Sequence, residues 1–486
     1  MIQPAKKSKF DLHKRIWKRR GRVLLILLIL LAVVFIPRQL SPKAPGEPAA
    51  TLPVFSLAGY HRLLILAPHC DDETLGSAGL ILAAERAGIE VRVVIATNGD
   101  GFFFATAQNL RKLYLGSADY IRMGEVRQQE SLAALKILGV KQDQVTFLSY
   151  PDRGTPSEWN DHWTAQNPYR SPYSRDTKSP YPITYNPKSV YAGQDYLSDL
   201  MSILKSYRPD LIVYPNPDDV HPDHWGLNAF TWLAITEINH ADANFQPTQL
   251  TYLVHRPDFP TVRGLKPQES LVPPPTLMAL YPKDWYRLDL TPADVVRKGQ
   301  AVQAYRSQLP LLHGLMDSFV RANELFAKVD NGTLPIVTRG DPLNPSTWTD
   351  AKGHSIPPAE GDPVGDFFVR SAIPGADLVA AYLARDTSDN LWVCSQARDE
   401  VSTGLTYRLR LKALDAGSVL SYAARTGQAQ SGWKKAIHSG VYACAQVSLA
   451  ELGHPWAVFV GTDVEGGGRL MDQTGWRLES ISPAPR

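Results

Sequence analysis

The sequence predicts an α/β fold, in which a mostly parallel sheet carries helices on both faces, followed by a C-terminal all-β sandwich. Two observations carry this prediction. From residue 61 onward, continuous Val/Ile/Leu strands alternate with helical patterns, which is typical of a parallel sheet with both faces covered. After residue 362 the hydrophobic period shifts towards two, and about eight short strands with turns between them indicate a sandwich. The 486 residues are enough for two to three domains.

The N-terminal region predicts a membrane anchor. Residues 1–22 carry nine Lys or Arg against a single acid, and this basic segment is expected to stay in the cytoplasm. The apolar run at 23–36 is shorter than the ~20 residues of a comfortable bilayer span, so it fits a cleaved signal or an uncleaved anchor; we favour the anchor. A Pro-rich linker follows at 37–59, and the remainder is then expected to be periplasmic or extracellular. Because the basic excess is local, the net charge of +3 gives no reason to expect nucleic acid.

A domain of alternating strands and helices is expected at 60–328. Its predicted strands are 62–67, 90–97, 145–150 and 210–215, and its predicted helices are 74–88, 117–138, 291–308 and 313–328.

The C-terminal part is expected to hold a linker at 329–362 and the sandwich at 363–486, with 366–372 as the first strand. Cys394 and Cys444 lie in strand-like stretches of this region. They could pair in an oxidising compartment, or both could be buried free thiols, and the sequence leaves both alternatives open.

Two polar motifs follow predicted strands. The motif "HCDDE" (69–73) comes directly after the first strand, and "HPDH" (221–224) comes after the fourth. Ligands in such sheets bind beyond the carboxyl ends of the strands, so we expect both motifs at the same edge. A catalytic zinc usually has three protein ligands and one open position for water. One carboxylate and one imidazole from the first motif, with one imidazole from the second, would form such a site.

The other polar residues of these motifs have the chemistry of acid–base catalysis. Asp71 would remain unligated beside the metal, where it could act as the general base for a water. His221, also unligated, could donate a proton or stabilise an oxyanion. Asp223 could orient an imidazole through its second nitrogen. Glu73 could complement a helix dipole, and Cys70 is not expected to be a ligand.

These motifs resemble those of the PIG-L/LmbE-like N-acetylglucosaminyl deacetylases, whose usual signature is His-Pro-Asp-Asp-Glu after the first strand and His-x-Asp-His later. Further stretches similar to this family are "TNGDG" (97–101), "RQQESLAALKILGV" (127–140) and "YRSQ" (305–308). The resemblance covers about residues 60–325. The chain departs from the signature at Cys70, where the family has Pro, and this predicts a more flexible turn.

The resemblance implies a Rossmann-like fold and a hydrolase that removes the acetyl group of an N-acetyl-hexosamine. Zinc, or another divalent metal, would be held by His69, Asp72 and His224. Metal-activated water would attack the amide with Asp71 as general base, and His221 would act as acid or oxyanion stabiliser. Arg127 and Asn98 are expected near the sugar.

The predicted anchor adds a cellular setting, in which the enzyme acts outside the cytoplasm on a cell-envelope glycan or glycolipid. Two alternatives stay open. In the first, "HCD" (69–71) and a distal His form the facial triad of a non-haem iron enzyme. In the second, the chain is a catalytically inactive envelope protein whose sandwich binds glycans.

A long segment rich in Pro, Tyr and Trp interrupts the alternating pattern at 151–192. Loops of this length are usually functional or disordered, and this one starts where a strand ends. It is interpreted either as a lid with aromatic residues that stack on sugar rings or as a packed surface excursion. The candidate stacking residues are Trp159, Trp163, Tyr169 and Tyr173.

Overall fold

The computed structural model describes residues 51–281, 283–329, 332–364, 373–415, 418–428 and 433–481. The segments predicted at 1–22 and 23–36, and the strand expected at 366–372, lie outside these described residues. Within the described ranges, no helix combines the length and the apolar character needed to cross a lipid bilayer.

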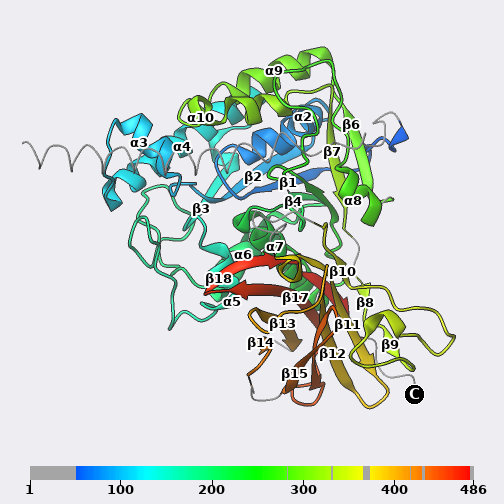
Figure 1. Cartoon of the computed structure of the whole chain (residues 1–486). Helices are drawn as coiled ribbons and strands as arrows, with labels where there is room; N and C mark the ends of the chain where they lie inside the picture. Colours follow the sequence, from blue (N-terminus) through cyan, green and yellow to red (C-terminus); the bar gives the residue numbers. More distant parts are fainter. Residues whose placement is uncertain are drawn as a thin grey trace, which may run out of the picture. The chain divides into compact units, whose positions relative to one another are not determined.

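A seven-stranded mixed sheet covered by helices forms the first part of the described chain (Figure 1). Its order is β3-β2-β1-β4-β5-β7-β6; β1 to β5 are parallel, and β7 pairs antiparallel with both β5 and β6. The strands are β1 (Arg62–Ala67), β2 (Glu90–Thr97), β3 (Val145–Tyr150), β4 (Leu211–Pro215), β5 (Thr248–Tyr252), β6 (Trp285–Asp289) and β7 (Asn323–Lys328). The strand order reverses between β1 and β4, and such sheets bind ligands at that point.

The apolar run of β1 is explained by burial on both faces of the sheet. Leu63 and Ile65 enter one hydrophobic cluster, whereas Leu64 and Leu66 enter another. Successive side chains of a strand point to opposite faces, so a strand covered on both sides is apolar throughout. This confirms the predicted α/β sheet with helices; the sheet itself is mixed, because β7 runs antiparallel to both of its neighbours.

The helices fall into two groups according to the cluster that they enter. Helices α2, α4 and α9 contribute to the cluster of Leu63, and α6 and α7 contribute to the cluster of Leu64. The helices are α2 (Asp72–Arg86), α3 (Phe103–Leu110), α4 (Ser117–Leu138), α5 (Thr155–Asn160), α6 (Gly193–Tyr207), α7 (Pro222–Ala241), α8 (Pro275–Leu280), α9 (Pro292–Val302) and α10 (Leu309–Met316). Helices α2 and α7 therefore begin next to the two polar motifs.

The helix predicted at 313–328 is wrong in its second half. Helix α10 ends at Met316, and residues Asn323–Lys328 form strand β7 between β5 and β6. The sequence "NELFAK" is rich in helix formers, but pairing with strands on both sides overrides this weak preference.

The C-terminal part is β-rich and forms two six-stranded sheets. Their orders are β10-β11-β12-β16-β15, with β9 beside β11, and β14-β13-β17-β19-β8, with β18 beside β17. Both sheets contribute to one hydrophobic cluster, for example with Val393 and Val460. The strands are β8 (Gly332–Thr333), β9 (Ile336–Val337), β10 (Glu360–Gly361), β11 (Leu378–Asp386), β12 (Asn390–Ala397), β13 (Thr406–Asp415), β14 (Ser418–Arg425), β15 (Trp433–Ser439), β16 (Tyr442–Ser448), β17 (Ala457–Gly466), β18 (Arg469–Gln473) and β19 (Arg477–Ser480). Strands β8 to β10 come from the stretch expected to be a linker.

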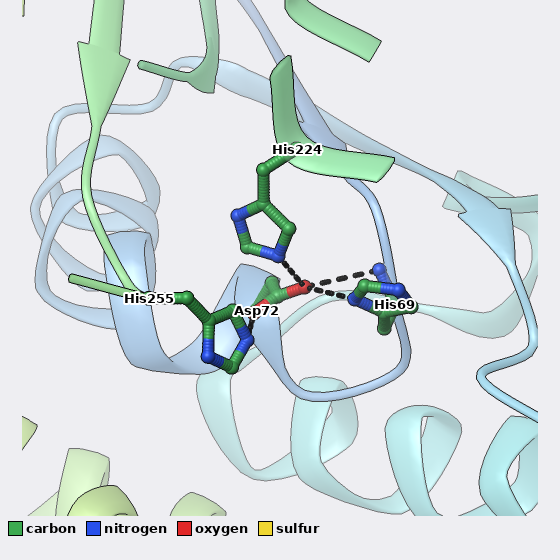
Figure 2. A group of neighbouring side chains, drawn as sticks. All are labelled: His69, Asp72, His224 and His255. Carbon is green, nitrogen blue, oxygen red and sulfur yellow. Dashed lines mark hydrogen bonds and ion pairs between the residues drawn. The ribbon is translucent and has the colours of Figure 1, made fainter. Parts of the chain in front are cut away.

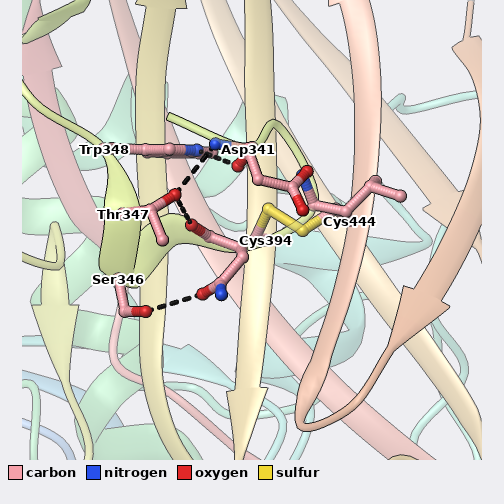
Figure 3. Close-up of a disulfide and its surroundings, with 8 residues drawn as sticks. Asp341, Ser346, Thr347, Trp348, Cys394 and Cys444 are labelled. Carbon is pink, nitrogen blue, oxygen red and sulfur yellow. Dashed lines mark hydrogen bonds between the residues drawn. A yellow bond between two sulfur atoms is a disulfide. The ribbon is translucent and has the colours of Figure 1, made fainter. Parts of the chain in front are cut away.

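A disulfide joins Cys394 of β12 to Cys444 of β16 (Figure 3). The two residues lie directly opposite each other in the antiparallel register, with their Cα atoms 4.1 Å apart. Of the two alternatives that the sequence left open, the structure therefore shows the paired one. Cys70 is the remaining cysteine, a buried free thiol.

The α/β part and the β-rich part share a hydrophobic cluster. Trp159 of α5 and Phe230 of α7 pack against Phe459 of β17 and Trp476, with ring centroids of Trp159 and Trp476 5.3 Å apart. The ammonium of Lys412, on β13, lies 4.6 Å from the centre of the Trp159 ring. We name these side chains the shared core.

Because Trp159 is 0% exposed, it cannot stack on a substrate, and this part of the lid interpretation is wrong. Trp163 is partly buried and lies parallel to Phe230, with centroids 6.0 Å apart. The packed alternative therefore describes this stretch of 151–192. Tyr169 and Tyr173 are both partly buried, and a stacking role for them stays a prediction.

The Glu479 carboxyl on β19 makes stability depend on pH. Burial raises its pKa to about 7, partly offset by the charge of Arg477. Between its usual value of 4.5 and about 7, the folded chain keeps a proton that the unfolded chain loses, so the free energy of unfolding falls as pH rises. We expect Glu479→Gln to reduce this decrease, which is at most ~1.4 kcal/mol per pH unit. The decrease is measured from the urea unfolding midpoints of the protein and the variant at pH 5 and pH 7. If the midpoints of both proteins change equally with pH, the prediction is wrong.

Candidate metal centre

The carboxyl ends of four parallel strands bring imidazoles and carboxylates together. His69 and Asp72 follow β1, Asp152 follows β3, the "HPDH" motif follows β4, and His255 follows β5. The ligand atoms fall into two groups, each within 4.8 Å: His69, Asp72, His224 and His255; and His69, Asp152, His221 and Asp223. The structure thus brings together the three predicted ligands His69, Asp72 and His224, and their role as ligands stays a prediction.

Asp72, the first residue of α2, lies at the centre of the first group (Figure 2). Its Oδ2 atom lies 3.0 Å from His69 Nδ1 and 3.1 Å from His224 Nε2. Its Oδ1 atom lies 3.9 Å from His255 Nε2 and, although buried, accepts no hydrogen bond from any described residue. A buried oxygen without a partner costs about 1–3 kcal/mol. A divalent cation among these nitrogen and oxygen atoms would remove that cost, so the residues fit a metal.

The electrostatics of the first group also favour a cation. Burial opposes protonation of His69, but hydrogen bonds with Asp152, Asp223 and Asp72 outweigh it and raise its pKa well above the usual value. Burial likewise opposes protonation of His224, yet Asp219 and Asp72 raise its pKa to about 9. Both rings therefore hold an extra proton in the absence of metal, and metal binding displaces such protons. The donor set suits zinc and also iron, cobalt or manganese.

Carboxylates on the far side of the rings hold the imidazoles in place. Asp223 Oδ2 lies 3.1 Å from His69 Nε2, and Asp219 Oδ2 lies 3.0 Å from His224 Nδ1. Asp223 was predicted to orient an imidazole, and the structure places it on His69 and not on the adjacent His224. Metal-bound histidines generally need such a partner on the second nitrogen.

The second group is already satisfied by backbone donors. Asp223 accepts hydrogen bonds from the amides of Arg153 (2.6 Å) and Thr155 (3.3 Å), and Asp152 accepts one from Gly101 (2.7 Å). Neither carboxylate has a buried oxygen without a hydrogen-bond partner among the described residues, as Asp72 has. The first group is therefore the better metal site, and the second group orients it.

Asp71 lies beside the first group without belonging to it. Burial raises the pKa of its carboxyl to about 7, although the charge of Arg127 opposes this change. A base with a pKa near neutrality is suited to proton transfer at that pH. The Asp71 backbone has a φ of 141°, a conformation that costs about 1–3 kcal/mol in residues other than glycine and that clusters at functional sites.

Arg127, on α4, and Glu73 hold the strained turn at Asp71. Arg127 Nη2 donates to Asp71 Oδ2 (3.2 Å) and to the Cys70 carbonyl (2.8 Å), and Nη1 donates to the Gly99 carbonyl (2.7 Å). Glu73 accepts from the Asp71 amide (3.0 Å) and from Tyr305 (2.7 Å). The structure thus places the buried Arg127 against the predicted base.

His221 precedes α7 and caps it. Its Nδ1 atom accepts a hydrogen bond from the Asp223 amide (3.3 Å), and its ring centre lies 4.5 Å from that of His69. Burial, and then the charge of His69, lower the pKa of His221 well below the usual value, so the ring is neutral. Since Nδ1 is an acceptor, the proton is on Nε2, which can donate a hydrogen bond to a substrate.

Asn98 and Cys70, which the sequence analysis also considered, belong to neither group. Asn98 is 1% exposed, accepts a hydrogen bond from Gln128 (3.1 Å) and donates one to Ser149 (3.3 Å). Cys70 is buried and contributes no ligand atom to either group. The imidazoles surround Asp72 and not Asp71, and this arrangement disfavours a facial triad built from "HCD".

Sequence reasoning missed His255, Asp152 and Asp219. Each follows a parallel strand, as the two motifs do. A search for polar residues just beyond the carboxyl end of every strand could therefore have found them. Asp219 lies within the stretch "PNPDDVHPDH" that includes the second motif. His255 comes shortly after "TQLTY", a strand in which three of the five residues are polar, so that its burial is not evident from the sequence. Burial, and then the charge of His224, lower the pKa of His255 to about 4, so this ring is also neutral.

Comparison with known proteins shows where the chain has relatives. A family model described as PIG-L, GlcNAc-PI de-N-acetylase, matches residues 64–235. The 1D-myo-inositol 2-acetamido-2-deoxy-alpha-D-glucopyranoside deacetylase of Mycobacterium sp. (strain JLS) is 30% identical over 200 residues, which are 37% of this chain and 57% of the relative. The protein of the same name from Corynebacterium urealyticum (strain ATCC 43042 / DSM 7109) is 28% identical over 201 residues, covering 40% and 54%. The chain thus spans a little over half the length of these curated relatives.

The chain was also compared with solved structures, and two similar ones have lower sequence identity. The N,N'-diacetylchitobiose deacetylase from Pyrococcus horikoshii is 18% identical with a TM-score of 0.35, covering 57% of this chain and 87% of that one. A deacetylase of the teicoplanin biosynthesis pathway is 20% identical with a TM-score of 0.36, covering 56% and 100%.

Proposed function

Because residues 64–235 form a PIG-L family domain, we propose that this chain is a metal-dependent hydrolase that removes the acetyl group of an N-acetyl-hexosamine. The resemblance predicted from the two polar motifs is thereby confirmed. One observation carries the proposal: the unligated Asp71, fixed by Arg127, lies beside the group of imidazoles around Asp72.

The side chains divide the work of amide hydrolysis. A divalent cation held by His69, Asp72 and His224, zinc in the proposed enzyme, would polarise the amide carbonyl and acidify the attacking water. Asp71 takes a proton from that water as the C–O bond forms. His221 donates a hydrogen bond from Nε2 to the developing oxyanion. Asp71 then passes the proton that it took from the water to the amide nitrogen, and the C–N bond breaks, which yields acetate and the free amino sugar.

The proposed substrate is an N-acetylglucosamine unit in a cell-envelope glycan or glycolipid. The curated relatives are named for an inositol glycoside of this sugar, and the family for its phosphatidylinositol form. The basic and apolar segments at 1–22 and 23–36 support a single-pass anchor with the catalytic domain outside the cytoplasm. The Cys394–Cys444 disulfide supports the same placement, since disulfides persist in oxidising compartments.

Replacement of Asp71 by Asn should abolish acetate release while the fold and the metal content stay unchanged. General-base catalysis contributes about 100- to 10,000-fold, so we expect a loss of that size. The assay uses the full-length protein purified in detergent, loaded with zinc. Its substrates are the soluble inositol glycoside, GlcNAc-PI and an N-acetylglucosamine oligomer.

The matched control is Asp143→Asn, the same change at an exposed position outside both groups, which is expected to keep the acetate release of the unmodified protein. Acetate release by Asp71→Asn at the rate of the unmodified protein would refute the proposed base. If the unmodified protein binds zinc and deacetylates none of the three substrates, the proposed substrate class is wrong.

A further inference from the structure

His255 is held by the same carboxylate that holds His224. The Asp219 Oδ2 atom accepts the His255 amide at 2.9 Å and lies 3.0 Å from His224 Nδ1. The His255 carbonyl in turn accepts a hydrogen bond from the Val220 amide at 3.0 Å. The backbone of His255 is thus fixed relative to the second polar motif, although the two are separated by a helix and a strand.

The His255 ring faces the unpaired oxygen of Asp72. Its Nε2 atom lies 3.9 Å from Asp72 Oδ1, too far for a hydrogen bond, and Asp72 Oδ1 has no other described partner. The ring centres of His255 and His224 are 4.8 Å apart. Figure 2 shows the three imidazoles converging on this carboxylate. A gap of this width between a ring nitrogen and a carboxylate oxygen suits an ion held between them.

We propose that His255 is a fourth protein ligand of the metal ion, in addition to His69, Asp72 and His224. This inference rests on the proposed metal-dependent function and extends its site. His255 has 30% of its side chain exposed, whereas the His224 side chain is 0% exposed, so His255 would hold the ion from the more exposed side of the group.

The test measures metal binding directly. Full-length protein, His255→Ala and His221→Ala are titrated with Zn²⁺ in competition with a chromogenic chelator. Loss of an outer carboxylate typically weakens metal binding ~10- to 100-fold, and we expect His255→Ala to weaken it by at least about 100-fold. His221 is the matched control, because it is another histidine close to His255, with 5.2 Å between the ring centres. Unlike His255, it uses its Nδ1 atom to accept a backbone hydrogen bond. We expect His221→Ala to change the affinity less than about 10-fold.

The Co²⁺-loaded proteins provide a second readout, since the visible absorption of Co²⁺ reports its coordination. His255→Ala should alter this spectrum and His221→Ala should keep it. Thermal unfolding of the metal-free proteins shows whether His255→Ala folds as the unmodified chain does. Unchanged zinc affinity and an unchanged cobalt spectrum in His255→Ala would overturn the inference.

The outcomes also separate this inference from the proposed function. If His255→Ala weakens metal binding as expected but no substrate is deacetylated by the unmodified chain, the fourth ligand stands and the deacetylase proposal falls. If Asp71-dependent acetate release is found and His255→Ala binds metal as the unmodified chain does, the deacetylase proposal stands and the fourth ligand falls. If the unmodified chain binds no divalent metal, both are overturned.

Discussion

Replacement of Trp159 by Ala is expected to lower the free energy of unfolding by about 3–5 kcal/mol, the usual cost of removing a large buried aromatic. The side chain is 0% exposed and belongs to the shared core, in edge contact with Phe230, Phe459 and Trp476. The cavity would open between the α/β part and the β-rich part, where neither side can collapse without moving the other. Urea unfolding followed by far-ultraviolet circular dichroism measures the effect without using tryptophan fluorescence.

Trp159→Phe is the matched control. Phenylalanine keeps the aromatic packing, and the lost Nε1 atom has no hydrogen-bond partner among the described residues. We expect this variant to cost less than half as much as Trp159→Ala. If both variants unfold at the urea midpoint of the unmodified protein, Trp159 does not join the two parts as described.

Lys298→Met is expected to destabilise the protein by a similar ~3–5 kcal/mol, because removing one partner of a buried ion pair leaves an uncompensated charge. Lys298 on α9 lies 2.6 Å from Glu324 on β7, and both side chains are at most 1% exposed. Lys298 also donates to the Leu75 carbonyl at 2.8 Å. The same Glu324 accepts the amides of Gly79 (2.7 Å) and Leu80 (2.9 Å), so the pair fixes helix α2, which begins at Asp72.

The double variant Lys298→Met/Glu324→Gln tests this reason. If the uncompensated carboxylate causes the loss, neutralising it should recover part of the stability, so the double variant should unfold at a higher urea concentration than Lys298→Met at pH 7. A double variant that is no more stable than Lys298→Met would contradict this reason. Glu324→Gln alone, which removes one of the two oxygens that accept the amides of Gly79 and Leu80, measures the cost of that lost acceptor.

The parts of the fold that follow local patterns were predictable from the sequence. The run of β1 is apolar because both faces of the sheet are covered, and "HCDDE" follows it without a break. A strand that is buried on both faces is apolar along its length, whereas β5 ("TQLTY") has polar residues at three of its five positions and is not recognisable as a strand from the sequence. For this reason the sequence pointed to the edge of the sheet but missed His255.

What could not be predicted depends on contacts between distant segments. Residues Asn323–Lys328 form a strand only because β5 and β6 flank them. Trp159 was a candidate for sugar stacking because nothing local shows that Trp476, more than 300 residues later, covers it. Asp223 precedes His224 in the sequence, yet the turn at the start of α7 directs its carboxylate to His69.

The shared core has a consequence for how this protein can change over evolutionary time. Helix α5, which carries Trp159, starts at Thr155, and the Thr155 amide donates to the same Asp223 carboxylate that orients His69. Phe459 and Trp476 are thus linked through Trp159, helix α5 and Asp223 to the predicted ligand His69, although both lie outside residues 64–235, which the family model matches. We therefore expect substitutions at these two aromatic positions to be constrained by the site as well as by the packing between the two parts.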